Sequence, residues 1–419
     1  MSTGTQGKRG WSIWWPATLS ALPGGIWAMG VGSMFMDISS ELIHSLLPIF
    51  MSSTLGASML SIGLIEGVAE ATAAISKVFS GALSDFLPKR KPLMILGYGL
   101  AAFTKPIFPL AGSIGWVFGA RFLDRVGKGI RGAPRDALVA EISPPELRGA
   151  SFGLRQALDS VGALLGPLLA VIFMGMFADN IRSVMWMGVL PAFVAVALLA
   201  TYVREPEVEN AGSTVRAPLR LVVVKNLPVH YWAVVLLGAV FTLARFSEAF
   251  LVLRAQNVGL SLGYVPLVMI VMNVFYSLFA YPAGAAADRL RPRALLLVGL
   301  IFLFAADLLL AAAAGPFMAF LGAALWGSHM ALTQGLLAKL VADTSTTDLR
   351  GTAFGVFNLV SGLALLLASV IAGALWSSIG PSSTFLAGAG FTAVAALGVL
   401  IYRSRKPVLP HATGEGIPR

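Results

Sequence analysis

Apolar stretches of about 20 residues recur along almost the whole chain, and they constrain its fold more than any other feature. A helix of that length crosses a hydrocarbon core of about 30 Å. Of the 419 residues, 57% are hydrophobic and only 12% are charged, and the mean hydropathy is +0.81. Soluble domains carry about 25% charged residues. The sequence therefore predicts an all-α membrane protein and excludes a single anchored soluble domain.

Turn signals divide the apolar runs into six segments on either side of one long polar break. That break, residues 204–227, is rich in charge and proline and predicts a cytoplasmic linker between two six-helix bundles, 26–203 and 228–403. An interfacial N-terminus, 1–25, and a cytoplasmic tail, 404–419, flank them. The expected spans are 26–50, 58–84, 92–112, 115–140, 149–176, 183–203, 228–253, 262–286, 294–314, 316–341, 352–378 and 383–403.

Lysines and arginines gather in alternate loops, for example at Lys89–Lys91 and Arg289–Arg293. Cytoplasmic loops carry an excess of these residues, so we expect both termini in the cytoplasm and the chain in the inner (plasma) membrane. The same distribution accounts for the net charge of +10 without a nucleic-acid partner. The short loops that carry no lysine or arginine lie near 51–57, 113–115, 315 and 378–383.

The two predicted bundles share an internal repeat. Val139–Gly149 reads VAEISPPELRG, and Val341–Gly351 reads VADTSTTDLRG. A second pair lies at nearly the same offset: Gly81–Asp85 reads GALSD and Gly284–Asp288 reads GAAAD, and basic residues follow each. Parallel six-helix repeats with a solute path between them are an architecture of alternating access. The repeat therefore indicates a transporter.

These motifs resemble those of the major facilitator superfamily, over roughly residues 25 to 405. Gly81–Lys91 resembles that superfamily's signature loop after the second helix. Arg125-Val-Gly-Lys128-Gly129 resembles the R-x-x-Q-G signature of proton-coupled members, with lysine in place of glutamine. Gly162 to Pro167 resembles part of the antiporter signature, although its second glycine pair is missing. The resemblance implies twelve transmembrane helices in two six-helix halves and favours proton-coupled export.

The resemblance also implies a latch on the cytoplasmic side. Gly81 would permit close helix approach, and Asp85 would lie over a neighbouring helix end and pair with a basic residue. Residues assigned to gating are Gly81, Asp85, Arg90 and Arg148 in the first half and Gly284, Asp288, Arg289 and Arg350 in the second.

Ionisable side chains inside the predicted spans are functional candidates, because charge at bilayer depth is costly. Helical spacing puts Asp37, Glu41 and His44 on one face of the first helix. We expect proton coupling by Asp37, Glu41, Glu66, Glu70 and Arg125, with Arg125 competing for an ionised carboxylate. The residues assigned to substrate binding are Asp37, Glu41, His44, Glu66, Glu70, Arg121, Lys128, Arg155, Asp159, Arg245, Glu248 and Asn273.

Some of these groups also have a structural interpretation. Asp124 and Asp159 have basic neighbours on their own helices and are assigned equally to ion pairing and to function. Lys105, which precedes Pro106, is expected to extend toward the outer interface. His44 is expected to be hydrogen-bonded rather than a metal ligand. Because the first half holds most of the charge, the second half is expected to supply a more apolar wall.

The function that these features predict is secondary active transport, as a proton-coupled antiporter that exports a small solute. Three solute classes stay open: a drug-like cation, a divalent metal and a small organic anion, the last imported or exported. A bacterial branch that includes nickel-resistance permeases is similar over Arg125–Ala140, but the tail has only His411 and cysteine is absent. The alternative from another class is a receptor or scaffold that does not transport. We expect no enzyme activity, cofactor or resident metal, and a monomer in the lipid bilayer.

Overall fold

The computed structural model describes residues 21–87, 89–205, 227–290, 292–345 and 349–401. All regular elements in these ranges are helical. The elements of the first half are α2 (Gly24–Ile49), η1 (Phe50–Thr54), α3 (Met59–Phe86), α4 (Lys91–Thr104), α5 (Ile107–Leu110), α6 (Ile114–Ile142), η2 (Pro145–Leu147), α7 (Arg148–Met176), α8 (Ile181–Met187) and α9 (Val189–Tyr202). Those of the second half are α10 (Val229–Leu243), α11 (Ala249–Asn257), η4 (Leu262–Tyr264), α12 (Leu267–Arg289), α13 (Pro292–Ala311), α14 (Pro316–Thr344), α15 (Arg350–Ser378) and α16 (Pro381–Ile401).

The all-α membrane class is confirmed. Within the described residues, nine helices are long and apolar enough to cross a membrane. The charged helix α6 and the helix α14 do not meet that criterion, and α10 is a shorter apolar helix, so the number of twelve crossings stays a prediction. The predicted N-terminal segment, linker and tail fall mostly on 1–20, 206–226 and 402–419, which lie outside the described ranges.

Three predicted spans are each divided into two helices. The span 92–112 breaks between α4 and α5 at Pro106, which lacks the backbone N–H that a continuous helix needs. The span 183–203 breaks at Gly188, between α8 and α9. The span 228–253 breaks at 244–248, between α10 and α11. Irregular backbone at membrane depth is tolerated where it lines a cavity or is buried in protein, so the third break is a candidate functional position.

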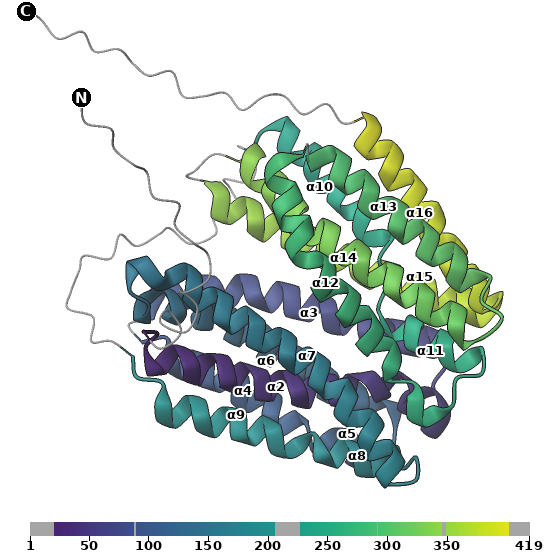
Figure 1. Cartoon of the computed structure of the whole chain (residues 1–419), viewed down its shortest axis with the longest axis horizontal. Coiled ribbons are helices and arrows are strands. Elements are labelled where there is room, and N and C mark those ends of the chain that lie inside the picture. Colours follow the sequence, from purple (N-terminus) through teal and green to yellow (C-terminus); the bar gives the residue numbers. More distant parts are fainter. Residues whose placement is uncertain (1–20, 88, 206–226, 291, 346–348, 402–419) are drawn as a thin grey trace, which may run out of the picture.

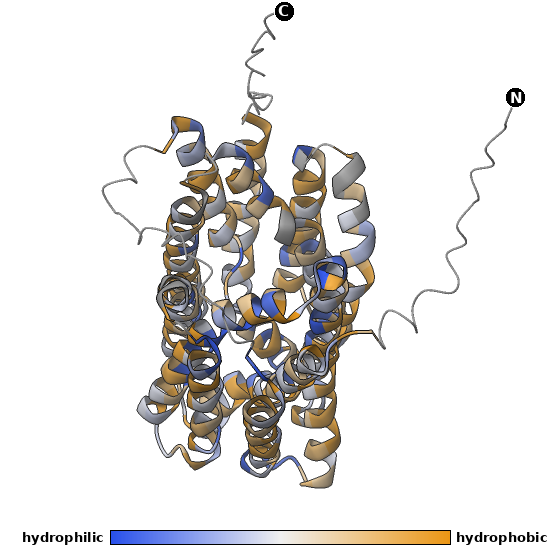
Figure 2. Ribbon diagram, turned by 90° about the vertical axis from the view of Figure 1, so that its left-hand side faces the viewer, coloured by the Kyte–Doolittle hydropathy of each residue, from blue (hydrophilic) through white to orange (hydrophobic). Residues whose placement is uncertain are grey.

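The two halves lie side by side as separate bundles (Figure 1). They meet near α11 and diverge toward the end at which α2 begins and α9 ends. Hydrophobic residues cover most of the helices, while hydrophilic residues gather in the space between the bundles and at helix ends (Figure 2). Large apolar side chains such as Leu190 and Phe317 are exposed on the outside. This distribution suits a lipid environment with a polar path through the middle.

Glycines bring the backbones of α3 and α15 together, across the boundary between the halves. A Cβ added at Gly63 would overlap the carbonyl oxygen of Ser369, and one at Gly373 would overlap that of Met59. A Cβ at Gly67 would lie 2.9 Å from the carbonyl oxygen of Leu366. Small residues at helix interfaces permit this close approach. The two halves are therefore held together here by direct backbone contact.

A second glycine contact positions the candidate acids of the first helix. A Cβ at Gly162 of α7 would lie 2.9 Å from the Cβ of Asp37, and one at Gly166 would lie 2.8 Å from the Cβ of Glu41. The partial antiporter motif therefore acts as a packing surface, which fixes α2 against α7 at the level of both carboxylates.

Inside the first half, a buried ion pair joins three segments. Lys105 is fully buried, and its Nζ donates to Oδ1 of Asp124 on α6 (2.8 Å) and to Oγ of Ser40 on α2 (2.9 Å). The expectation that Lys105 extends to the outer interface is therefore wrong. The reason is that Asp124 and Ser40 offer the ammonium group partners inside the bundle, and sequence spacing along α6 did not reveal this pairing.

Replacing Gly63 by alanine is expected to destabilise the protein by about 1–3 kcal/mol, because the added methyl group meets backbone that cannot rotate away. Gly119→Ala on α6 is the matched control, since nothing lies within 4 Å of its added Cβ and alanine favours helix. Thermal unfolding of the purified variants measures both effects. Equal or higher stability of Gly63→Ala would contradict the backbone contact.

Replacing Lys105 by methionine is expected to cost about 3–5 kcal/mol, because the Asp124 carboxylate is left buried without its cation. Adding Asp124→Asn in the same chain should restore much of the loss, since the uncompensated charge is removed. The melting temperatures of the single and double variants give the comparison. A double variant no more stable than Lys105→Met would show that the two groups are not coupled.

Candidate solute and proton site

Two adjoining cavities lie between the halves. The mouth chamber, about 480 Å³, is lined by Asp37, nearer the start of α2, and the deep chamber, about 420 Å³, is lined by His44 and Pro48, farther along that helix. Glu41, Glu70, Lys128, Thr242 and Leu365 line both, so the two chambers are continuous. The mouth chamber is also lined by Asp37, Lys77, Arg131, Arg135, Asp136 and Asp159, and the deep chamber by His44, Glu66, Arg121, Arg125, Arg245, Phe246, Glu248 and Trp326.

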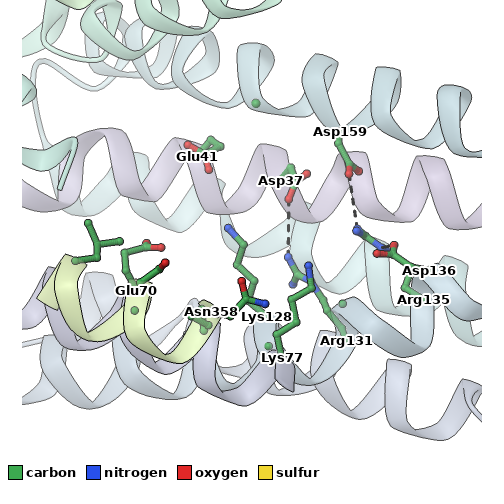
Figure 3. Close-up of a pocket in the computed structure, with 18 of the residues that line it drawn as sticks. Asp37, Glu41, Glu70, Lys77, Lys128, Arg131, Arg135, Asp136, Asp159 and Asn358 are labelled. Atoms are coloured by element: carbon green, nitrogen blue, oxygen red, sulfur yellow. Dashed lines mark hydrogen bonds and ion pairs between the residues drawn. The ribbon is translucent and has the colours of Figure 1, made fainter. Parts of the chain in front are cut away.

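Charges from α2, α6 and α7 surround the mouth chamber (Figure 3). Oδ1 of Asp37 lies 3.8 Å from Nη2 of Arg131, and Oδ2 of Asp159 lies 3.7 Å from Nη1 of Arg135. Asp159 also accepts from Arg155 at 2.7 Å, one helical turn away on α7. These pairs join α2 to α6, α6 to α7, and two neighbouring residues of α7. Acidic and basic side chains therefore face one another around the mouth chamber.

Two carboxylates of α3 bind arginines of α6 in the deep chamber. Glu66 accepts from Nη2 of Arg121 at 2.6 Å, and Glu70 lies 2.9 Å from Nη2 of Arg125. The side chain of Glu66 is 6% exposed, whereas that of Glu70 is 32% exposed. The two pairs therefore differ in access: Glu66–Arg121 is enclosed, and Glu70–Arg125 faces the cavity.

His44 lies between charged groups of α6. Its Nε2 contacts Nη1 of Arg121 and lies 3.7 Å from Oδ2 of Asp124. The imidazole therefore takes part in the same network as the two α3 acids. Among the described side chains, no three of the histidine, aspartate and glutamate type gather closely enough to hold a metal ion.

Several cavity-lining charges have no ion-pair partner within 4 Å in the described part of the chain. They are Glu41, Lys77 and Lys128 from the first half and Arg245 and Glu248 from the second. Arg245 and Glu248 lie in the break between α10 and α11. Phe246 and Trp326 stand next to them and give the second-half wall of the deep chamber an aromatic surface. The charged wall of the first half thus faces a second-half wall that combines these two charges with aromatic and aliphatic surface.

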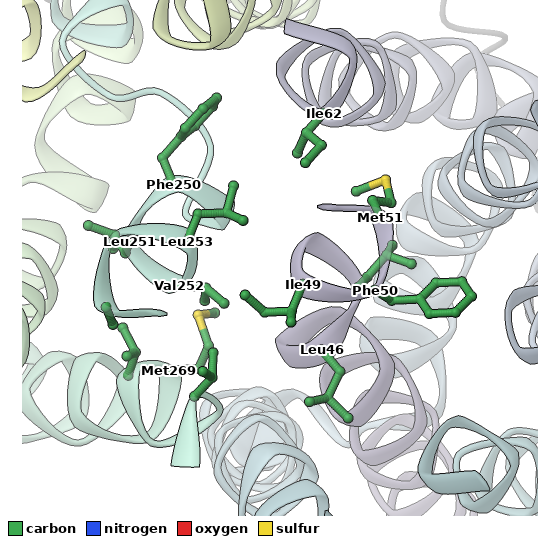
Figure 4. Packing of buried hydrophobic residues seen from close by; sticks show 14 of the residues in the cluster. Leu46, Ile49, Phe50, Met51, Ile62, Phe250, Leu251, Val252, Leu253 and Met269 are labelled. Carbon is green, nitrogen blue, oxygen red and sulfur yellow. The ribbon is translucent and has the colours of Figure 1, made fainter. Parts of the chain in front are cut away.

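The deep chamber ends at an apolar cluster (Figure 4). This apolar plug consists of Leu46, Ile49, Phe50, Met51, Ile62, Phe250, Leu251, Val252, Leu253 and Met269. All ten side chains are at most 7% exposed, and they come from both halves. Burial of apolar surface holds the halves together at this end. The path between the halves is therefore closed at one end and widens toward the other.

The predicted residues separate into three groups. Those for proton coupling line the chambers, as do all of those for substrate binding except Arg155 and Asn273. Arg155 binds Asp159, and Asn273 on α12 donates to the carbonyl of Ala163 on α7 at 3.2 Å, a contact between the halves. The side chains of Asp85, Asp288, Arg289 and Arg350 lie outside the described part of the structure.

The described gating candidates lie at helix ends. Arg90 binds Glu141 at the end of α6, and its backbone N–H donates to Glu205. Arg148 donates to the carbonyl of Ala140 at 3.2 Å. A Cβ added at Gly81 would lie 3.7 Å from Cβ of Ala133 on α6, an ordinary van der Waals contact, and nothing lies within 4 Å of a Cβ at Gly284, so neither position requires glycine. The role of all eight residues in gating stays a prediction.

One buried acid of the second half was not among the predicted site residues. Asp307 on α13 is fully buried, and neither carboxylate oxygen has a hydrogen-bond partner in the described residues. The signal was present in the sequence, because Asp307 interrupts the apolar run from Leu300 to Ala314. Asp307 did not fit the expectation that the second half supplies a more apolar wall.

The sequence matches the family model of the Major Facilitator Superfamily over residues 29–253 and 244–418. An uncharacterised MFS-type transporter of Methanocaldococcus jannaschii is 34% identical over 380 residues, which cover 89% of this chain and 93% of that protein. The multidrug resistance protein MdtH of Edwardsiella ictaluri is 25% identical over 202 residues, 48% of each chain.

Solved structures give the same fold. The nucleoside transporter NupG superimposes with a TM-score of 0.74 over 90% of this chain and 99% of that one, at 14% identity. A POT family transporter gives a TM-score of 0.75 over 92% and 98%, at 12% identity. With the repeat, the two bundles and the charged path between them, these matches show that the chain belongs to the major facilitator superfamily and is a multi-pass membrane transporter, not an enzyme.

Proposed function

We propose that this transporter is a proton-coupled antiporter that exports an amphiphilic organic solute by alternating access. The observation that carries the proposal is the Glu70–Arg125 pair, which lies on the wall of a cavity open toward one end and closed at the other. A proton and a solute that reach the same chamber can bias opposite states of one two-state bundle. The transporter family favours this function over a receptor or scaffold.

Glu70 is the carboxylate best placed to carry the proton. Its side chain is partly exposed to both chambers, so a proton can reach it without breaking the packing. Glu66 is enclosed and bound to Arg121 at 2.6 Å, which suits a structural partner. Asp37 and Glu41 also line the cavity and are the next candidates.

Protonation of Glu70 would alter the contact between the halves. The Glu70–Arg125 pair attaches α3 to α6, while α3 packs through Gly63 and Gly67 against α15 of the other half. Loss of the carboxylate charge removes one of the two ion pairs between α3 and α6, leaving Glu66–Arg121, and frees the Arg125 guanidinium to interact with the chamber. A local proton-binding event therefore acts on the helix that joins the halves.

The chamber walls favour an amphiphilic solute. Phe246 and Trp326 offer aromatic surface on one side, and Glu41 and Glu248 offer carboxylates without ion-pair partners in the described residues. An aromatic surface beside a carboxylate suits a lipophilic cation. The similarity to MdtH, whose name denotes multidrug resistance, supports the same class.

A small organic anion is the second candidate. Lys128 and Arg245 line the deep chamber and have no ion-pair partner among the described side chains. Together they could hold a carboxylate or phosphate group. Ligand-induced thermal stabilisation of the purified protein distinguishes the classes, since a ligand that binds only the native state raises the melting temperature.

We expect the wide end of the path to face the cytoplasm. The chain has no cysteine, so single cysteines can be introduced at Lys89, at the basic end, and at Ser53, at the opposite end. An impermeant thiol reagent added to intact cells should label the Ser53 variant and leave the Lys89 variant unlabelled until the cells are permeabilised. The reverse pattern would invert the topology and make the observed state outward-open.

Glu70→Gln is expected to keep solute binding and to lose the response to a pH gradient, because the amide cannot exchange a proton. Glu66→Gln is the matched control on the same helix and is expected to lower thermal stability instead, because Arg121 loses its enclosed partner. Solute flux in proteoliposomes, with and without an imposed pH gradient, is the measurement. If Glu70→Gln kept full gradient-driven transport, the proton-binding site would have to be assigned to Asp37 or Glu41 instead.

A further inference from the structure

Asp307 is an acid enclosed in the second half without a polar partner. Its exposed fraction is 0%, and both carboxylate oxygens lack a hydrogen bond within the described residues. A Cβ added at Gly388 of α16 would lie 2.8 Å from Oδ2 of Asp307 and 3.0 Å from Cε1 of Phe246. The carboxyl group and the Phe246 ring therefore share one small space against α16.

This environment is suited to a proton and to nothing larger. Burying an ionised carboxylate without a partner costs far more than burying the neutral acid. Neither chamber is lined by Asp307, so an organic cation has no room beside it. A metal ion needs several oxygen or nitrogen ligands, and no acid or histidine cluster of that kind occurs among the described residues. The acid form fits the site as it stands.

An aromatic chain connects this site to the apolar plug. Phe246 packs against Phe250 of the plug, with ring centroids 5.7 Å apart, and against Trp326 at 5.3 Å. Gly299 faces Thr333 and Leu310 faces Gly322, so the antiparallel helices α13 and α14 bring Asp307 to the level of Trp326. Phe246 lies in the break before α11, so a displacement of α11 and Phe250 that opens the plug would also move its ring, which lies beside the same α16 glycine as Asp307.

The helices and loop around Asp307 carry their other charges away from its carboxylate. None of them forms an ion pair or hydrogen bond with its carboxylate in the described residues. On α11, Arg254 binds the carbonyls of Leu310, Ala311 and Ala313 at the end of α13, and it is the nearest cation along that helix. The other ionisable groups on these elements are Arg293 on α13, His329, Lys339 and Asp343 on α14, Arg245 and Glu248 before α11, and Tyr276, Tyr281, Asp288 and Arg289 on α12, whereas α16 has none.

We propose that Asp307 is a second proton-binding site, which holds its proton while the plug is closed and exchanges it with water when Phe246 moves away. This inference rests on the proposed proton-coupled function and adds a site in the other half. The O–H bond of the acid breaks only in the open state, where water accepts the proton and hydrates the carboxylate. Each half then contains a proton site: Glu70 in the first and Asp307 in the second.

Infrared spectroscopy of the purified protein tests the site without transport. Near neutral pH the wild type should show a carbonyl band of a protonated carboxylic acid that Asp307→Asn and Asp307→Leu both lack. Asp343→Asn, which changes an exposed acid of the same half, should keep it. Because Asp307→Leu removes a partnerless polar group from an apolar site, that variant should also be at least as thermostable as the wild type. Spectra that do not differ between wild type and either Asp307 variant would overturn the proposal.

Transport stoichiometry tests whether the proton is carried. At zero membrane potential, each coupled proton multiplies the steady-state solute ratio about tenfold per unit of pH difference. Asp307→Asn should therefore lower that ratio about tenfold per pH unit relative to wild type and to Asp343→Asn. An unchanged ratio would refute exchange at Asp307. If the wild type itself ignores the gradient, proton-coupled export fails, while the infrared band still decides whether Asp307 holds a proton.

Discussion

A charge inside a lipid-embedded bundle has little water to stabilise it, and this constraint shapes the first half of the molecule. Nearly every buried charge there has its partner on another helix: Lys105 with Asp124, Arg121 with Glu66, and Arg125 with Glu70. Breaking such a pair leaves an uncompensated charge, which costs more than the pair contributes. The pairs therefore fix which helices of the first half lie together.

The same constraint separates pairs that hold the fold from pairs that can change. Lys105–Asp124 is enclosed, with side chains only 0% and 4% exposed, which suits a pair that holds the fold. Glu70–Arg125 has the same chemistry but faces a cavity, so this pair is accessible from the path between the halves. The second half differs, because its buried acid Asp307 has no counter-charge among the described residues. The ring of Phe246 lies beside the same glycine of α16 as its carboxyl group. Access to water, more than residue type, decides which acid can exchange a proton.

The sequence predicted the helical membrane class, the two related halves and the helix faces that carry charge, because each depends on local spacing. Asp37 and Glu41 do face the path between the halves, as their four-residue spacing on α2 indicated. Pairing could not be predicted in the same way, since it depends on how helices are rotated against each other. Lys105 has its partner on α6, nineteen residues away, and nothing in the local pattern distinguishes it from an interfacial lysine. Asp307 was detectable by the rule used for the other acids, but no prediction included it.

The contact between α3 and α15 has a consequence for how such a protein can diversify. It is made largely by backbone atoms at Gly63, Gly67 and Gly373, so it does not depend on the shape or charge of the side chains nearby. Other chamber-wall side chains, such as Phe246 and Lys128, belong to different elements: the break before α11 and α6. Substitutions in the chambers can therefore accumulate and alter the cargo while the joint between the halves keeps its geometry. Mutations can therefore change which solute is bound without changing the contact between the halves.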